Sequence, residues 1–222
     1  MLTGFENGGE IVSTKAQAMS IILVRHGETP LNVARMLQPA DTPLSTAGLA
    51  QAQAVASRLA GLPLAGIVSS DLPRALRTAE AIAAASGLPV STTALLHERN
   101  FGDLRGQPYD TLGFNPLTMS EAPPGGESAD EFEARVAQAF AHIVALRGTL
   151  GGPLAVVTHG LVIRALLAHH VQLQAGGELP LRVGNTSVSI VSALPPHAVE
   201  LLDCTRHLDA GNRHAAHSLS GG

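Results

Sequence analysis

The sequence has little charge, few aromatic side chains and a single cysteine. Charged residues make up 14% of the 222 residues and aromatic residues 3%, whereas an average globular domain is about 25% charged. The core must therefore be built from aliphatic side chains and alanine. Because Cys204 has no second cysteine to pair with, an internal disulfide is excluded, and the composition fits a reducing compartment.

The chain also lacks a basic surplus and a long apolar run. Its 14 Lys and Arg against 18 Asp and Glu give a net charge of −4, which argues against a general nucleic-acid binder. The uncharged stretch 81–97 is interrupted by Ser, Gly, Pro and Thr, so it is too polar for a span of about 20 apolar residues. Residues 1–19 lack the basic start and apolar centre of a secretory signal. We therefore expect a cytoplasmic protein with no membrane or nucleic-acid partner.

Apolar runs alternate with helical patterns from residue 20 onward. Strands are predicted over residues 21–24, 66–69, 154–158 and 186–191. Helices are predicted over residues 46–60, 72–85 and 161–169, and after residue 128. This alternation is typical of an α/β domain of three layers, with a mostly parallel central sheet flanked by helices on both faces. A chain of this length usually buries about 70% of its unfolded surface, so it needs no disulfide or metal to fold.

Local signals mark several boundaries and core positions. Asp71 precedes one predicted helix and is expected to cap it, while Ser128 and Glu131 form a capping box ahead of another. In the helix at 46–60 the expected core contacts are Leu49, Val55 and Leu59. The apolar face of the helix after residue 128 consists of Phe132, Val136, Phe140, Ile143 and Val144. We expect one domain over residues 20–208, between a disordered leader at 1–19 and a disordered tail at 209–222.

Basic and imidazole side chains follow three of the predicted strands. Arg25 and His26 follow the first, Arg74 lies in the helix after the second, and His159 and Gly160 follow the third. Ligands of open parallel sheets bind beyond the carboxyl ends of the strands, where helix N-termini point. We therefore expect these residues to form a compact anion site. A phosphoryl group suits it, because arginine binds phosphate oxygens in a bidentate manner.

Two histidines in one phosphate pocket need separate roles. A neutral imidazole can attack phosphorus and form a phosphohistidine, and neighbouring cations keep that imidazole unprotonated. A general acid must then protonate the leaving oxygen. Glu98, which follows an apolar run, is the best candidate; Glu28, Asp103 and Glu127 are the alternatives.

The motif at residues 23–29 (LVRHGET) resembles the signature of the histidine phosphatase superfamily, the phosphoglycerate mutase-like proteins. Further motifs resembling that family follow in the same order. They are Asn32, residues 41–45 (DTPLS) with Gly48 and Gln51, residues 69–79 (SSDLPRALRTA), Glu98 with Gly102 and Gly106, residues 124–128 (PGGES) and residues 157–160 (VTHG). The resemblance covers roughly residues 20–207, and it rests on several motifs in the same order rather than on one.

The resemblance implies a phosphoglycerate mutase-like fold and a reaction that needs no cofactor or metal. It implies that His26 is the phosphorylated nucleophile and that Glu98 donates and accepts the proton. The implied catalytic residues are His26, Glu98, His159, Arg25 and Arg74, and the implied substrate-binding residues are Arg25, Asn32, Arg74, His159 and Gly160. Arg77, one turn after Arg74, could reach the same pocket. Leu31 and the pair Gln38-Pro39 depart from the family pattern, which affects the contacts to the substrate.

Other conspicuous residues receive simpler interpretations. Adjacent residues on a helix point in different directions, so His169 and His170 make a poor metal chelate. Cys204 lies near a strand expected close to the end of the domain, and we interpret it as a small buried residue or an incidental thiol. Residues 115–127 form a Pro/Gly-rich loop. The cluster of Phe114, Leu117 and Met119 in and beside it serves either ordinary packing or an apolar lid, and the sequence leaves both open.

The function predicted from these residues is a phosphomonoester hydrolase of the histidine acid type, acting on a small phosphorylated metabolite. One alternative is a cofactor-dependent phosphoglycerate mutase, which would use the same residues. The resemblance implies that such mutases carry a longer insertion after the acid motif, whereas only 61 positions separate Glu98 from His159 in this chain. A second alternative is a phosphate-binding module without turnover. A homodimer is left open.

Overall fold

A computed structural model describes residues 19–208 of the chain. Six strands form one sheet in the order β3-β2-β4-β1-β5-β6. The strands are β1 (Ser20–Arg25), β2 (Gly66–Ser69), β3 (Val90–Thr92), β4 (Leu154–Thr158), β5 (Val188–Ser192) and β6 (Val199–Cys204). The predicted leader, apart from Met19, and the predicted tail lie outside the described residues.

Strand β1 lies at the centre of the sheet and pairs with neighbours of opposite direction. It runs parallel to β4, with Arg25 opposite Thr158, and antiparallel to β5. Strands β2 and β3 continue the parallel part beyond β4, and β6 pairs antiparallel with β5. The carboxyl ends of β1, β2 and β4 therefore meet at one edge of the sheet, and the amino end of β5 reaches the same edge.

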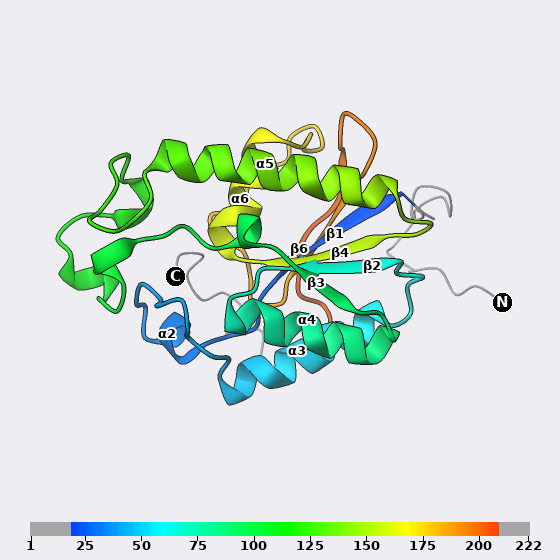
Figure 1. The fold of residues 1–222 in the computed structure, drawn as a ribbon, viewed down its shortest axis with the longest axis horizontal. Coiled ribbons are helices and arrows are strands. Elements are labelled where there is room, and N and C mark those ends of the chain that lie inside the picture. Colours follow the sequence, from blue (N-terminus) through cyan, green and yellow to red (C-terminus); the bar gives the residue numbers. More distant parts are fainter. Residues whose placement is uncertain (1–18, 209–222) are drawn as a thin grey trace.

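Helices cover both faces of the sheet, which confirms the predicted three-layer α/β architecture (Figure 1). The α-helices are α2 (Pro30–Val33), α3 (Thr46–Leu59), α4 (Pro73–Ser86), α5 (Ala129–Gly148) and α6 (Gly160–His169). Short 3-10 helices lie at η1 (Ala94–Leu96), η2 (Gly102–Leu104), η3 (Tyr109–Thr111) and η4 (Pro116–Thr118). In residues 19–208 we find no helix long and apolar enough to cross a membrane.

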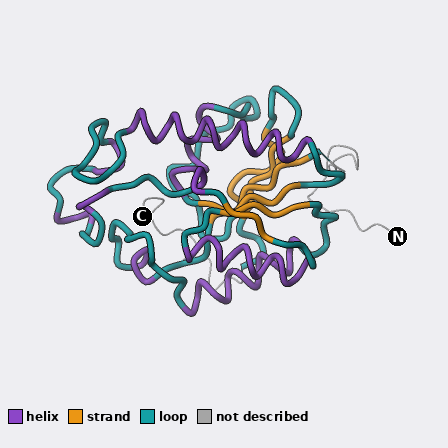
Figure 2. The backbone as a smooth tube through the Cα atoms, in the orientation of Figure 1, coloured by secondary structure: helices purple, strands orange, loops and turns teal. Residues whose placement is uncertain are grey.

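The alternation of side chains along β1 divides the core in two. Ile21 and Leu23 pack with α5 and α6, whereas Ile22 and Val24 pack with α3 and α4. This is the expected consequence of a strand whose successive side chains point to opposite faces. The segments between β1 and α3 and between β3 and α5 extend from the same end of the strands (Figure 1 and Figure 2).

Two local predictions were wrong, and each has a physical reason. The residue that caps α4 is Leu72, without a side-chain hydrogen bond, and the helix begins with Pro73. Asp71 instead contacts His97. Leu49 is 42% exposed, while Val55 and Leu59 are buried, because Leu49 lies on the outer side of the first turn of α3. The capping box of Ser128 and Glu131 is confirmed.

Candidate active site

The two predicted pocket histidines follow neighbouring parallel strands. Arg25 pairs with Thr158 in the β1–β4 register, so the next residues, His26 and His159, leave the sheet side by side. The backbone N–H of His26 still donates to the carbonyl of Thr158 at 3.0 Å. The two imidazole rings have their centroids 5.1 Å apart with an interplanar angle of 59°. Both side chains are buried.

His26 is held as a neutral ring in one tautomer. Its Nδ1 lies 2.7 Å from the carbonyl oxygen of Gly27, which can only accept, so Nδ1 carries the proton. Burial, together with the charges of Arg25 and Arg74, lowers the pKa of His26 well below its ordinary value. The unprotonated nitrogen is therefore Nε2, whose lone pair is available for attack on an electrophile.

His159 has a different hydrogen-bond environment. Its Nε2 lies 2.9 Å from Ser70 Oγ, and its Nδ1 has no hydrogen-bond partner among the described residues. Burial and the charge of Arg74 lower the pKa of His159 well below the ordinary value. When the Ser70 hydroxyl donates to Nε2, the proton of a neutral His159 lies on Nδ1, where it can be donated to an anion.

Arg25 and Arg74 are buried and fixed through backbone carbonyl groups. Arg25 Nη1 donates to Val183 O at 2.6 Å. Arg74 Nη1 donates to the carbonyls of Pro39 and Ala40 at 3.2 and 3.3 Å, and its Nε has no partner among the described residues. Desolvation lowers the pKa of each guanidinium to about 10, so both remain charged at neutral pH. Such preorganised cations favour a buried anion.

Glu98 is the buried carboxyl group of this site. Its Oε1 accepts from the backbone N–H of Arg99 at 3.0 Å, and its Oε2 accepts from that of Leu161, in the first turn of α6, at 3.2 Å. Burial raises the pKa of Glu98 above its ordinary value, against the opposing effect of these two hydrogen bonds. Glu98 also interacts electrostatically with Arg74 and Arg25. A carboxyl group of this kind can hold a proton at a higher pH than an exposed one.

Asn32 presents an amide donor that has no acceptor within residues 19–208. It forms a capping box with Thr29 at the start of α2, in which Asn32 Oδ1 accepts from the backbone N–H of Thr29 at 3.2 Å. The same oxygen accepts from Asn185 Nδ2 at 3.3 Å. Both bonds fix the orientation of the amide, and Asn32 Nδ2 is left buried without a partner among the described residues. Gly160, the remaining predicted substrate-binding residue, begins α6 directly after His159 and is buried.

The alternatives for the acid and the arginine lie elsewhere or have other partners. Glu127 is paired with Arg135 at 2.8 Å, and Asp103 is exposed. Glu28 accepts a hydrogen bond from Ser45 Oγ at 2.8 Å. Arg77 is exposed on α4 and pairs with Glu80 at 2.9 Å. By contrast, Arg74 acts electrostatically on His26, and Glu98 interacts electrostatically with Arg74 and Arg25.

Several residues at the site were missed by the sequence analysis. Asn185 Nδ2 donates to the backbone carbonyl of His26 at 3.1 Å as well as to Asn32. Tyr109 interacts electrostatically with Glu98 and Arg25, and burial raises the pKa of its hydroxyl. Arg105 interacts electrostatically with Arg74. Asn185 precedes a strand instead of following one, so the rule for parallel strands could not find it.

The other conspicuous residues form no second site in the described part of the chain. His170 stacks on Phe140 at 5.0 Å, and His169 lies 3.9 Å from Glu133. Within residues 19–208 no group of three or more His, Cys, Asp or Glu side chains could hold a metal ion. Leu117 packs against the core and Phe114 is 48% exposed, so the predicted cluster in the 115–127 loop is divided between packing and solvent.

Known proteins are similar to this chain in both sequence and fold. Residues 21–199 match the family described as the histidine phosphatase superfamily (branch 1). A relative from Citrobacter koseri, named "Probable phosphoglycerate mutase GpmB", is 36% identical over 208 residues, covering 86% of this chain and 96% of the relative.

Some solved structures with the same fold are named as phosphatases. A mycobacterial glucosyl-3-phosphoglycerate phosphatase is 30% identical with a TM-score of 0.71, covering 85% of this chain and 100% of that one. The alpha-ribazole phosphatase from Shigella flexneri is 25% identical with a TM-score of 0.72, covering 84% and 96%. The chain belongs to the histidine phosphatase superfamily, which confirms the resemblance drawn from its motifs.

Proposed function

We propose that this member of the superfamily is a phosphomonoester hydrolase that acts through a phosphohistidine on a small phosphorylated metabolite. The observation that carries the proposal is the pair of buried imidazoles of His26 and His159, whose ring centroids lie 5.1 Å apart. The buried Arg25 and Arg74 interact electrostatically with His26 and with the carboxyl group of Glu98. A neutral nucleophile, two fixed cations and a carboxyl group with a raised pKa are the parts that phosphoryl transfer to an imidazole requires.

In the first step, His26 Nε2 attacks phosphorus while the bond from phosphorus to the ester oxygen breaks. Arg25 and Arg74 bind the peripheral oxygens and balance the charge that develops there. His159, through Nδ1, and Asn32, through Nδ2, supply neutral donors to the same oxygens. Glu98 gives its proton to the leaving oxygen, so the alcohol departs uncharged and Glu98 is left ionised.

In the second step, a water molecule attacks the phosphorus of the phosphohistidine. Glu98, now a carboxylate, takes a proton from that water as the phosphorus–nitrogen bond breaks. The products are inorganic phosphate, a neutral His26 and a protonated Glu98, so the enzyme returns to its starting state without a cofactor.

The mutase reaction is a second candidate, because the relative from Citrobacter koseri carries that name. A mutase returns the phosphoryl group to another oxygen of its substrate and must keep water away from the phosphoenzyme. The two structural neighbours named as phosphatases support hydrolysis instead. Incubation with 3-phosphoglycerate and a bisphosphoglycerate primer separates the two: phosphate release faster than isomer interconversion supports the phosphatase, and the reverse supports the mutase.

The hydrolase proposal is tested with His26→Ala and para-nitrophenyl phosphate. A loss of kcat/KM smaller than about tenfold would eliminate the mechanism, because removal of a nucleophile costs far more than that. Trapping of labelled phosphohistidine on the wild-type chain, and its absence from His26→Ala, distinguishes an enzyme from a module that only binds phosphate.

A further inference from the structure

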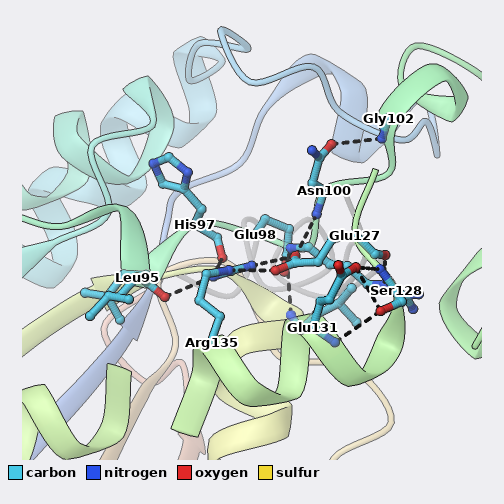
Figure 3. A network of polar contacts seen from close by, with 12 residues as sticks. Leu95, His97, Glu98, Asn100, Gly102, Glu127, Ser128, Glu131 and Arg135 are labelled. Atoms are coloured by element: carbon cyan, nitrogen blue, oxygen red, sulfur yellow. Dashed lines mark hydrogen bonds and ion pairs between the residues drawn. The ribbon is translucent and has the colours of Figure 1, made fainter. Parts of the chain in front are cut away.

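The segment that carries Glu98 has little regular structure of its own. It runs from the end of η1 at Leu96 to the start of η2 at Gly102, and it lies outside the sheet. Thr158 of β4 donates through its hydroxyl to the carbonyl of Leu96 at 2.8 Å. Closer to Glu98, the main chain is bound by the side chains of Arg135 in α5 and of Glu127 in the loop before that helix (Figure 3).

Arg135 uses its guanidinium to join three parts of the chain. Its Nη1 donates to the carbonyl oxygens of Leu95 and His97 at 2.9 and 2.8 Å. Its Nε and Nη2 donate to the two carboxylate oxygens of Glu127, each at 2.8 Å. The side chains are only 19% and 14% exposed, and the guanidinium lies over the ring of Phe132 at 5.3 Å. The planar guanidinium of Arg135 is therefore fixed on α5, and it binds the main chain at residues that precede Glu98.

Glu127 binds the main chain on the other side of Glu98, so that Arg135 and Glu127 together form a clamp around this residue. Glu127 Oε2 accepts from the backbone N–H of Asn100 at 3.2 Å. Its own backbone N–H donates to the carbonyl of Asn100 at 2.8 Å. The main chain is thus tied two residues after Glu98 and one and three residues before it. The carboxyl group of Glu98 itself bonds to Arg99 and Leu161 instead, so the clamp holds the backbone that carries it.

We propose that Arg135 and Glu127, as one bidentate pair, are positioning residues that set the place from which Glu98 transfers its proton. The inference rests on the proposed phosphatase reaction. Proton transfer requires heavy atoms within hydrogen-bond reach, and a misplacement of about 1 Å can cost about a hundredfold in rate. A nearly buried ion pair is weak evidence for stability alone. The three hydrogen bonds from its side chains to the main chain of Leu95, His97 and Asn100 define one geometry for the backbone that carries Glu98.

The test compares two phosphate esters whose leaving groups differ in how much they depend on protonation by Glu98. Phenyl phosphate releases a poor leaving group that must be protonated, whereas dinitrophenyl phosphate releases a stable anion. We expect Arg135→Met to lower kcat/KM for phenyl phosphate by about 10- to 100-fold and for dinitrophenyl phosphate by less than about threefold, as Glu98→Gln also should. Arg135→Lys, which cannot form the fork, should show the same pattern in weaker form.

Arg147→Met is the matched control, since Arg147 is a buried arginine further along the same helix that donates to Leu150 O at 2.9 Å. It should leave the ratio of the two esters unchanged. An equal loss on both esters in Arg135→Met, or no loss on either, would overturn the positioning role. If Arg135→Met does not fold, Arg135→Lys and Glu127→Gln decide by the same ratio.

The two proposals fail in different ways. Wild-type hydrolysis of either ester and its loss in His26→Ala test the phosphatase reaction. Only the ratio of kcat/KM between the esters tests the clamp, because a variant that is merely less stable loses activity on both.

Discussion

The Nδ1–H of His26 donates to the carbonyl oxygen of the next residue, Gly27, at 2.7 Å. This bond sets the tautomer of the ring before any substrate arrives. Because the histidine is buried beside two arginines, the same ring also stays unprotonated well below the ordinary pKa of the side chain. The nucleophile is thus prepared by its position in the fold, without a neighbouring general base.

The pH dependence of kcat/KM should reflect this arrangement. The lowered pKa of His26 places the ascending acidic limb below 6.5, the ordinary histidine value. The raised pKa of Glu98 places the descending limb above 4.5, the ordinary glutamate value. The carboxyl group keeps its proton to higher pH, and activity is lost only as the pH rises through this raised pKa. A profile with phenyl phosphate, corrected for the ionisation of the substrate, checks both limbs.

Glu98→Gln provides the control for that profile. Its residual activity should lack the descending limb, since the amide does not titrate. An acidic limb at or above 6.5 in the wild type, or a descending limb that survives in Glu98→Gln, would contradict the assignment.

Asn32→Ala should lower kcat/KM by about 10- to 100-fold, which corresponds to one lost hydrogen bond to a charged oxygen. The buried Nδ2 of Asn32 has no protein acceptor among the described residues, so the substrate is its partner in the proposed complex. Asn185→Ala should have a smaller effect in the same direction, because it removes one of the two donors that orient Asn32. Asn115→Ala, at the exposed start of η4, is the control, and an equal effect there would refute the assignment.

The sequence predicted the main parts of the fold because their signals are local. The strands at 66–69 and 154–158 have the predicted bounds, since each is a short segment rich in β-branched residues that lies between turn residues. Strand β3 was missed because its three residues are partly or fully exposed at the sheet edge, so no apolar run marks them. The exposure of Leu49 could not be read from α3 alone, because the orientation of a helix depends on its neighbours.

The parts of the site that follow parallel strands could also be predicted. Arg25, His26 and His159 lie where the rule for strand ends places them. Asn185 and Arg135 obey no such rule: Asn185 lies before an antiparallel strand, and Arg135 acts 38 residues from the carbonyl of His97 that it binds. Contacts between residues so far apart in the chain depend on tertiary packing, and no local pattern in a single sequence predicts them.

Gly48→Ala should destabilise the protein by about 2 kcal/mol or more. A methyl group at Gly48 would lie closer than 3.0 Å to main-chain atoms of Glu28, and one at Gly27 would lie that close to the carbonyl of Gly48. The two glycines therefore allow α3 to approach the loop after His26. Gly61→Ala, where nothing lies within 4 Å, should change the free energy of unfolding by less than about 0.5 kcal/mol. Urea unfolding of both variants measures the difference, and equal values would refute the packing argument.

Arg74→Lys should lower kcat/KM by about a hundredfold, while Arg77→Lys should change it by less than about twofold. Arg74 is buried and anchored to the carbonyls of Pro39 and Ala40. A lysine keeps the charge there but lacks the planar fork that binds two phosphate oxygens while retaining an anchor. Arg77 points to solvent and pairs only with Glu80 in the described structure, so its replacement leaves the pocket intact. Steady-state kinetics with para-nitrophenyl phosphate measure both variants, and inhibition by inorganic phosphate should weaken only in Arg74→Lys. If Arg77→Lys were the damaging change, the phosphate pocket would have to be assigned to the other face of α4.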